Sequence, residues 1–326
     1  MSEQNPTKVA IACQGGGSHT AFTAGVLKEL LRKWDDEYEL VGISGTSGGA
    51  FNALAAWYGL VTADEDRAIE LLDAIWEDLS ASSFSDRFMN DFVVGLSRLG
   101  STGVPMLQVS PYDIPGSEVG KDEIRETLER HIDFDAVPDL CGRNTPELVV
   151  GTVNINAGIF ETFTNEEVTP EAILASAAVP AMFKAVKIDG HYHWDGLISQ
   201  TPPGDDLMTV GADRKPDELW IIQINPQERE GEPTSLEEIA DRRNELAGHI
   251  SLNQELRVIE RVNEWIDSGH LPESDFSKTK IRRIEMGRAY HCSTKVDRSP
   301  SFLQELMDLG EQRAEEFLAS RPITDD

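Results

Sequence analysis

A serine flanked by glycines is the first group in this sequence that could do covalent chemistry. The stretch VGISGTSGGAFNALAAW, residues 41–57, places Ser47 between Gly45 and Gly49 in a G-x-S-x-G pattern. Where a strand turns into a helix, this pattern forms a nucleophile elbow. The turn is so tight that only glycine fits beside it, and the serine hydroxyl projects from the backbone. Ser47 is therefore predicted to be a nucleophile if the fold supplies a base; otherwise it belongs to a glycine-rich turn without chemistry.

A second glycine-rich segment, QGGGSH at residues 14–19, follows a predicted buried strand and leads into a predicted helix. Its backbone N–H groups are unobstructed, and the positive end of a helix dipole suits an anion. Beside Ser47, these N–H groups would hold the oxyanion that forms when a carbonyl is attacked, at roughly 3–4 kcal/mol per donor. A dinucleotide site is disfavoured, because G-x-G-x-x-G needs a glycine where Thr20 stands. The predicted oxyanion loop is Gly15, Gly16 and Gly17.

A serine nucleophile needs a base, and the sequence offers two kinds. Asp195, in KIDGHYHWDGLISQTPP, lies where a predicted strand ends in a loop. An aspartate with an ordinary pKa of about 3.9 is a weak base, so Asp195 would need partial desolvation and a short hydrogen bond to Ser47. From the residues alone, Asp195 and Gly196 are interpreted equally well as a turn. No histidine is marked as a triad member; chain order makes His291 the candidate for a histidine base, and His19 lies beside the glycine loop.

Alternating apolar and amphipathic segments predict an α/β protein with a sheet covered by helices on both faces. The absence of repeats and low-complexity linkers predicts one domain over residues 1–326. The motifs fall within residues 8–203, and residues 204–326 are expected to complete the sheet and add C-terminal helices. The predicted strands are residues 8–13, 39–44, 147–153, 159–164, 185–188, 191–194, 218–224 and 281–286. The predicted helices include residues 64–79, 171–178, 234–267 and 301–318.

The charge of the chain excludes one class of partner. It has 58 acidic and 29 basic residues, which gives a net charge of −29. Nucleic-acid binding needs a basic face, so we expect none, and simple electrostatic adsorption to anionic lipid is also opposed. The acidic excess is spread along the chain and forms no tail. Two interpretations are a protein that is merely acidic and one that is adapted to high salt, where salt screens charge repulsion beyond a few ångströms. The even distribution favours adaptation to high salt.

Cysteine usage and apolar run lengths predict a cytoplasmic protein. The three cysteines, Cys13, Cys141 and Cys292, are odd in number and widely spaced, which fits neither a disulfide framework nor a zinc site. No apolar run reaches the ~18 residues of a membrane span, and the first residues, MSEQNPTKVAIACQ, lack the pattern of a secretory signal. We expect neither a metal nor an organic cofactor.

Three motifs in order resemble those of the patatin-like phospholipases. They are the glycine loop QGGGSHTAFTAGVL, the elbow GTSGG and the segment ASAAVPAMFKAVKIDGHYHWDGLISQTPP, which together extend over residues 8 to about 203. The resemblance implies a three-layer α/β/α fold with a mostly parallel central sheet. It also implies hydrolysis of lipid acyl esters by a Ser-Asp dyad of Ser47 and Asp195, with the glycine loop as the oxyanion hole. Acyl-ester lipid is then the expected substrate, with transient contact to a membrane or lipid aggregate.

Two departures from the family pattern bear on the pocket. The family usually has Arg or Lys where His19 stands, so a permanent cation near the oxyanion is missing. It usually has Gly or Ala where Leu197 stands, and this bulkier side chain beside Gly196 would narrow the pocket. The alternatives to a Ser-Asp hydrolase are a carboxylesterase with a histidine base and a lipid-binding homologue without catalysis.

Residues 82–100, SSFSDRFMNDFVVGLSRLG, carry apolar side chains at roughly helical spacing. One interpretation is a lid or acyl-chain wall over the site, and the other is a helix that buries one face in the core. The residues that give this pattern are Phe84, Phe88, Met89, Phe92, Val93, Leu96 and Leu99.

Overall fold

A mixed, mostly parallel sheet forms the middle layer of the structure, a computed structural model that describes residues 5–101, 109–113, 118–180, 182–208 and 214–320. The strand order is β5-β6-β3-β2-β1-β7-β8, with β4 paired to β3. Strands β3, β2, β1, β7 and β8 are parallel, whereas β4, β5 and β6 add antiparallel pairs. The strands are β1 Thr7–Cys13, β2 Tyr38–Gly45, β3 Glu147–Asn154, β4 Ile159–Thr164, β5 Val186–Ile188, β6 His191–Asp195, β7 Glu218–Gln223 and β8 Lys280–Glu285.

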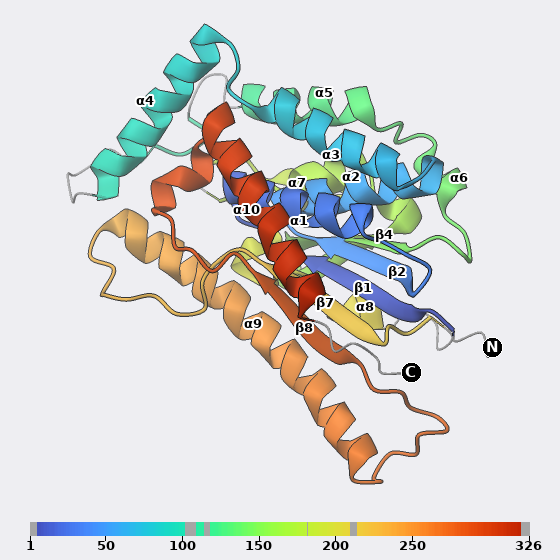
Figure 1. The fold of residues 1–326 in the computed structure, drawn as a ribbon. Helices are drawn as coiled ribbons and strands as arrows, with labels where there is room; N and C mark the ends of the chain where they lie inside the picture. The colour runs from blue at the N-terminus through green and yellow to red at the C-terminus, as the bar shows by residue number, and fades with distance from the viewer. Residues whose placement is uncertain (1–4, 102–108, 114–117, 181, 209–213, 321–326) are drawn as a thin grey trace.

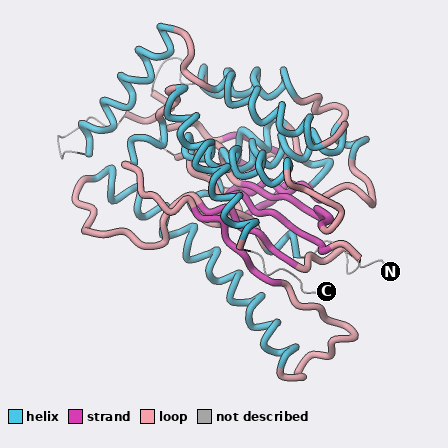
Figure 2. Tube along the Cα trace, in the orientation of Figure 1, coloured by secondary structure: helices cyan, strands magenta, loops and turns pink. Residues whose placement is uncertain are grey.

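Helices cover both faces of this sheet and make three layers, as Figures 1 and 2 show. On one face α1, α2, α3 and α10 pack over the larger core, and on the other α8 and α9 pack over a smaller one. The helices are α1 Ala21–Arg32, α2 Gly48–Thr62, α3 Glu65–Leu79, α4 Phe84–Ser101, α5 Val119–His131, α6 Val137–Leu140, α7 Pro170–Ser176, α8 Asp205–Met208, α9 Leu236–Asp267 and α10 Pro300–Ala319. The 3₁₀ turns are η1 Gly17–Thr20, η2 Asn165–Glu167, η3 Gly196–Ile198 and η4 Cys292–Val296.

The central strand β1 shows why an apolar run becomes a strand here. Successive side chains of a strand point to opposite faces, so both faces of a sandwiched strand must be apolar. Val9, Ile11 and Cys13 enter the core beneath α1 and α10. Ala10 and Ala12 enter the core beneath α9. Burial also raises the pKa of the Cys13 thiol, so Cys13 acts as a small apolar residue, as expected.

The α1–α10 contact depends on two glycines. A Cβ on Gly310 would lie 2.1 Å from the backbone oxygen of Phe22, and a Cβ on Gly25 would lie 2.0 Å from that of Met307. Only glycine allows the two helix backbones to approach so closely.

We therefore expect Gly310→Ala to lower the free energy of unfolding by about 2–3 kcal/mol, because the helices must separate. Chemical denaturation followed by circular dichroism measures this. The matched control is Gly95→Ala on α4, where an added Cβ has open space and should stabilise the helix by up to about 1 kcal/mol. Equal effects of the two substitutions would contradict the close crossing.

All the strands and helices predicted above are present. The hairpin turn at Asp189 and Gly190 is confirmed, with positive φ at both residues, 49° and 89°. Helix α5 is not among the predicted helices; of its residues, only Thr127 and Leu128 are buried. No helix in the described part of the chain is both long and apolar enough to cross a membrane.

Candidate active site

The elbow at the end of β2 has the geometry that the G-x-S-x-G pattern predicts. Ser47 has φ 57° and ψ −131°, a conformation that costs a non-glycine residue about 1–3 kcal/mol. A Cβ on Gly45 would lie 2.3 Å from the Gly49 oxygen, and a Cβ on Gly49 would lie 2.3 Å from the Cys13 oxygen. The two glycines therefore let β2 turn sharply into α2 beside the end of β1, and the strained residue between them is the serine.

Ser176, which is not among the predicted site residues, holds the strained Ser47 in place. The Ser47 amide donates a hydrogen bond to Ser176 Oγ at 2.8 Å, and Ser176 Oγ donates to the Gly151 carbonyl at 2.7 Å. Ser176 lies at the end of α7 and Gly151 on β3, so the elbow is tied to two neighbouring elements. The hydroxyl of Ser176 is thereby engaged with the backbone of the elbow.

Asp195 lies at the end of β6, which pairs with β3 through Asp195 and Thr152. Its side chain is fully buried, and that of Ser47 is 5% exposed. The Leu197 amide donates to Asp195 Oδ1 at 2.8 Å, whereas Oδ2 has no regular hydrogen bond within the described part of the chain. The Ser47 side chain is still close enough to act on the carboxyl as a hydrogen-bond donor. The fold thus brings the predicted nucleophile and the predicted base together.

The environment of Asp195 makes it a stronger base than an ordinary aspartate. Burial raises its pKa from 3.8 to about 7, although the Leu197 amide, which donates to Oδ1, and the nearby Ser47 hydroxyl each lower it. Desolvation therefore outweighs these two polar neighbours. A carboxylate with a pKa near neutrality suits general base catalysis at neutral pH.

The glycine loop packs directly against the elbow. A Cβ on Gly15 would lie 3.1 Å from Ser47 Cβ, so the two segments touch. The Gly15 amide donates to Thr201 Oγ1 at 3.0 Å and is engaged in this structure. The amides of Gly16 and Gly17 donate no hydrogen bond to the residues that the structure describes. Of the three loop amides, only that of Gly15 therefore has a hydrogen-bond partner in the described part of the chain.

The loop is anchored by residues of the C-terminal part of the chain. Asn225 Nδ2 donates to the Gly15 carbonyl at 3.2 Å, and Gln14 Oε1 accepts the amides of Ile224 and Asn225, each at 2.9 Å. The Lys295 carbonyl lies against Gly17, where it leaves no room for a Cβ. These contacts explain how residues beyond 204, which match no catalytic motif, still position the predicted oxyanion loop.

Lys295 also joins a buried cluster of charges behind the loop. Its ammonium group pairs with Asp241 at 2.6 Å and Glu245 at 2.9 Å. Glu245, only 2% exposed, also pairs with Arg242 on α9 and with Arg229, which precedes this helix. Each buried charge has an opposite partner, as such groups require.

His19 is buried near the glycine loop and carries no positive charge. Its ring is 3% exposed, is hydrogen-bonded to Thr294 Oγ1 at 2.7 Å and packs against Tyr290 and Phe302. Burial, with the Lys295 charge, lowers its pKa to about 3, so the ring is neutral. The family's cation at this position is therefore not replaced by a protonated histidine.

Gly196 and Leu197 follow the aspartate. A Cβ on Gly196 would lie 3.0 Å from both the Gly151 oxygen and Thr46 Cγ2, which explains the need for glycine beneath the elbow. Leu197 contributes its amide to Asp195, and its side chain is half-buried.

The other histidines have different partners. His291 Nδ1 is hydrogen-bonded to Ser293 Oγ at 2.8 Å, where it caps η4. His193 Nε2 is hydrogen-bonded to Glu161 at 2.8 Å. Neither ring has a recorded contact with Ser47 or Asp195 within the described part of the chain.

Helix α4 is present where the amphipathic segment 82–100 was noted, but the lid interpretation stays a prediction. The side chains of Phe84, Phe88, Met89, Phe92, Leu96 and Leu99 lie outside what the structure describes. Among its described side chains, Asn90 connects α4 to the segment after η4, through Asp297 at 3.0 Å and the Arg298 amide at 2.7 Å.

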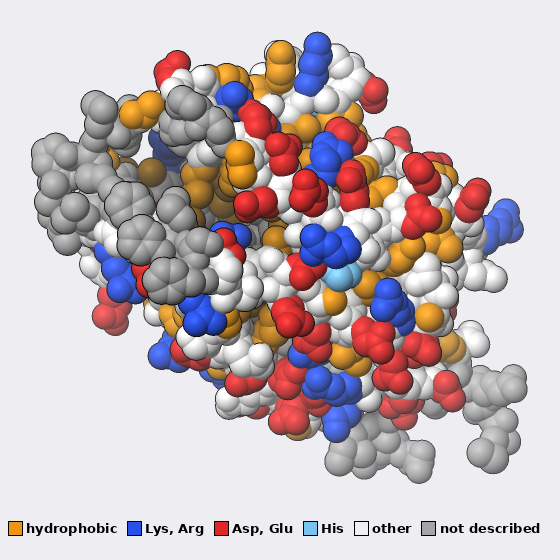
Figure 3. Space-filling model, turned by 90° about the horizontal axis from the view of Figure 1, so that it is seen from above, with side chains coloured by type: hydrophobic (Ala, Val, Ile, Leu, Met, Phe, Trp, Pro, Cys, Tyr) orange, Lys and Arg blue, Asp and Glu red, His pale blue; other side chains and the backbone are white. Residues whose placement is uncertain are grey.

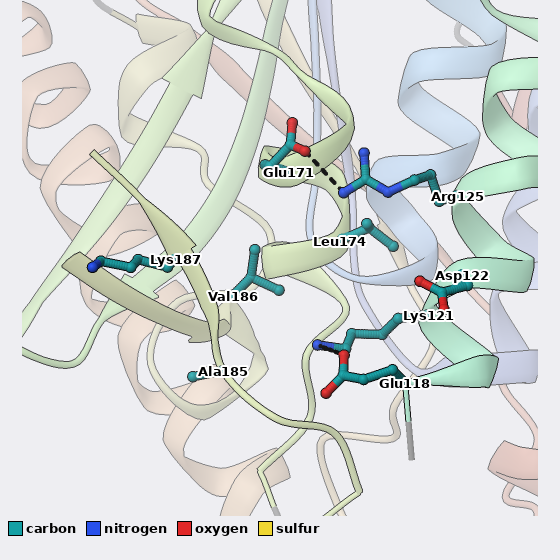
Figure 4. A pocket seen from close by; sticks show the side chains of 9 residues that line it. All are labelled: Glu118, Lys121, Asp122, Arg125, Glu171, Leu174, Ala185, Val186 and Lys187. Carbon is teal, nitrogen blue, oxygen red and sulfur yellow. Dashed lines mark ion pairs between the residues drawn. The ribbon is translucent and has the colours of Figure 1, made fainter. Parts of the chain in front are cut away.

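A cavity of about 260 Å³ lies elsewhere, between α5, α7 and β5 (Figure 4). Four of the charged residues that line it form two ion pairs: Arg125 with Glu171 at 2.8 Å, and Lys121 with Glu118 at 2.7 Å. Neither Ser47 nor Asp195 lines it. In the described residues, no group of three or more His, Cys, Asp and Glu side chains is placed to hold a metal.

Comparisons with known proteins bear on the family of the chain. A sequence pattern described as patatin-like phospholipase matches residues 11–208. Among solved structures, VipD from Legionella pneumophila is 13% identical with a TM-score of 0.47, over 97% of this chain and 67% of that one. The ExoU-SpcU complex from Pseudomonas aeruginosa is 13% identical with a TM-score of 0.31, over 98% of this chain and 53% of that one. This chain thus spans about half the length of the latter. The search of curated proteins finds no match.

The family pattern, rather than these distant structures, carries the assignment. It spans more than half of the chain and includes the glycine loop, the elbow and Asp195. The protein therefore belongs to the patatin-like phospholipase family.

Proposed function

We propose that this protein is a lipid acyl hydrolase in which Ser47 and Asp195 form a catalytic dyad. Family membership supports hydrolysis of lipid esters in general. The observation that supports the dyad is the meeting of the strained Ser47 with a fully buried Asp195 whose pKa is raised to about 7. Asp195 is favoured over His291 as the base, because the Ser47 side chain acts on the Asp195 carboxyl, whereas His291 Nδ1 is hydrogen-bonded to Ser293 Oγ.

The reaction proceeds in two steps. Asp195 accepts the Ser47 proton as the hydroxyl attacks the ester carbonyl, and the proton then passes to the departing alcohol. Water, activated by the same carboxylate, hydrolyses the acyl-serine and releases the fatty acid and free Ser47. The residues named here supply the nucleophile, the base and the anion site.

The oxyanion is held by the amides of Gly16 and Gly17, together with that of Gly48. The Gly48 amide lies in the first turn of α2, where no helix carbonyl is available to it. The amide after the nucleophile is the usual second donor in elbow-type sites. Gly15 supports the loop through Thr201 instead of contributing its own amide.

A fluorophosphonate probe tests the nucleophile. Wild-type protein is expected to be labelled at Ser47, and Ser47→Ala to remain unlabelled. Ser199→Ala, which changes a half-buried serine near Asp195, is the matched control and should be labelled like wild type. Labelling of Ser47→Ala at wild-type rate would overturn the assignment.

We also propose that the acidic surface is an adaptation to high salt. Figure 3 shows acidic side chains scattered over much of the described part of one face, with basic side chains between them. With a net charge of −29, self-repulsion opposes the folded state unless salt screens it.

Raising KCl from about 0.05 M to about 2 M should therefore increase the melting temperature by several degrees, as differential scanning calorimetry measures. Sucrose serves as the control, because it favours compact states without screening charge. A melting temperature independent of KCl would show that the charge has no such role.

A further inference from the structure

Helix α9 carries an exposed apolar face on the side away from the sheet. At 100° per residue, its six exposed apolar side chains fall within about 120° of the helix circumference. Leu252 and Leu256, which α9 buries against the sheet, point the opposite way. We call the exposed face the α9 stripe; its residues are Leu236, Ile239, Leu246, Ile250, Val258 and Trp265, with exposed fractions of 75%, 46%, 40%, 56%, 61% and 46%.

The same arc of α9 is basic, which is unusual for this chain. Arg243, Arg257 and Arg261 lie in it and are exposed. Glu264 is the one acidic residue of the arc, and it pairs with Arg261 at 3.5 Å. Arg243 and Arg257 form no ion pair with the residues that the structure describes. Three arginines against one glutamate reverse, locally, a net charge of −29.

We propose that the α9 stripe docks the protein on the surface of a phospholipid assembly. An amphipathic helix with arginines along an apolar face lies in the plane of such an interface. The apolar side chains, Trp265 among them, would enter the boundary between headgroups and acyl chains. The guanidinium groups would bind lipid phosphates, whose oxygens match their paired donors. The choice of lipid as the occupant rests on the hydrolase function proposed above.

The position of α9 places this surface close to the loop that follows Asp195. Gly248 lies on the inward side of α9. A Cβ on it would lie 2.5 Å from Thr201 Cγ2 and 3.4 Å from the Leu197 oxygen, so there is no room for one. Leu197 and Thr201 contact Asp195 and Gly15, respectively. The docking face and the loop after Asp195 are thus separated by one helix diameter, about 10 Å. Figure 1 shows α9 along the outer face of the sheet.

A second copy of the chain fits the stripe less well than lipid does. A twofold interface would bring the six arginines of the two arcs together against only two glutamates, the Glu264 of each copy. Lipid phosphates supply the missing anions. Because the whole molecule is acidic, binding needs both the apolar side chains of the α9 stripe and the arginines in the same arc.

Sedimentation with vesicles of phosphatidylcholine and phosphatidylglycerol tests the proposal. Ser47→Ala serves as the parent protein, so that no lipid is hydrolysed during the measurement. We expect it to bind, and Leu246→Glu/Ile250→Glu or Arg243→Glu/Arg257→Glu on that background to weaken binding by about tenfold or more. Matched controls change an exposed isoleucine and an exposed arginine elsewhere, Ile159→Glu and Arg143→Glu, and should bind like the parent.

The outcomes separate docking from catalysis. With Ser47 restored, the stripe variants should hydrolyse a soluble short-chain ester at the wild-type rate but lose activity on vesicles. Equal vesicle binding by parent and stripe variants would overturn the docking surface and leave the hydrolase proposal intact. Absent ester hydrolysis in wild type would overturn the hydrolase and leave the binding result intact. A dimer in light scattering that the stripe substitutions dissociate, without vesicle binding by the parent, would instead assign the stripe to a second copy.

Discussion

Asp195→Asn is expected to lower kcat/KM for ester hydrolysis by about 10³-fold or more, with the fold unchanged. The amide has nearly the shape of the carboxyl but cannot accept the Ser47 proton. Steady-state hydrolysis of a chromogenic short-chain ester measures the loss. Because the pKa of Asp195 is raised to about 7, wild-type kcat/KM should rise about tenfold per pH unit below that value and level off above it. The variant should lose this dependence.

The matched control is Asp189→Asn, in the exposed turn six positions before the proposed base. Asp189 has a positive φ of 49°, which asparagine adopts readily, so the hairpin should be preserved. Its kcat/KM and pH profile should equal those of wild type. If Asp195→Asn kept wild-type activity and pH dependence, the base would have to be another residue, and His291 would be the next to substitute.

The same Asp195→Asn substitution should stabilise the protein above pH 7. A carboxyl whose pKa rises from 3.8 to about 7 on folding costs the native state up to about 4 kcal/mol when both states are ionised. Below pH 3.8 the folded and unfolded states are both protonated, and there is no cost. Between these values the folded state retains a proton that the unfolded state has released, so wild-type stability falls as pH rises. The gain of the variant should therefore be absent near pH 4 and complete above pH 7.

Urea unfolding of both proteins across this pH range measures the gain, with Asp189→Asn again as the control. Asp189 is exposed, so its substitution should leave the pH dependence unchanged. A stability difference between Asp195→Asn and wild type that is constant with pH would contradict the raised pKa. A loss of activity together with a gain of stability is typical of a residue that is kept for chemistry at the expense of the fold.

The elements and the elbow could be predicted because their signals are local. A strand such as β1 is an apolar run of a length that suits a strand, and the elbow requires glycine at fixed offsets from Ser47, whatever the rest of the fold does. The hairpin at Asp189 and Gly190 was equally readable, because few residues adopt positive φ without strain. Helix α5 escaped prediction, because most of its residues are polar and only Thr127 and Leu128 are buried.

The tertiary structure decided which of the candidate groups meet. From the sequence alone, Asp195 and Gly196 could be interpreted equally well as a turn or as part of a catalytic site. The pairing of β6 with β3 placed Asp195 near the elbow and removed it from water. The supports of the site were also invisible in sequence. Ser176 and Asn225 are ordinary polar residues until the chain folds, and only then do their hydrogen bonds hold Ser47 and Gly15.

The sequence by itself thus determined the order of the elements, the strained position of Ser47 and the glycine loop, because each depends on steric rules that act over a few residues. Only the tertiary structure decided the pKa of Asp195 and the amides that are open to an anion. Desolvation depends on everything that surrounds a group, and Gly15, for example, is engaged by Thr201 from a distant part of the chain. These surroundings are assembled from segments that lie far apart in the sequence, and no local pattern indicates that they will be in contact.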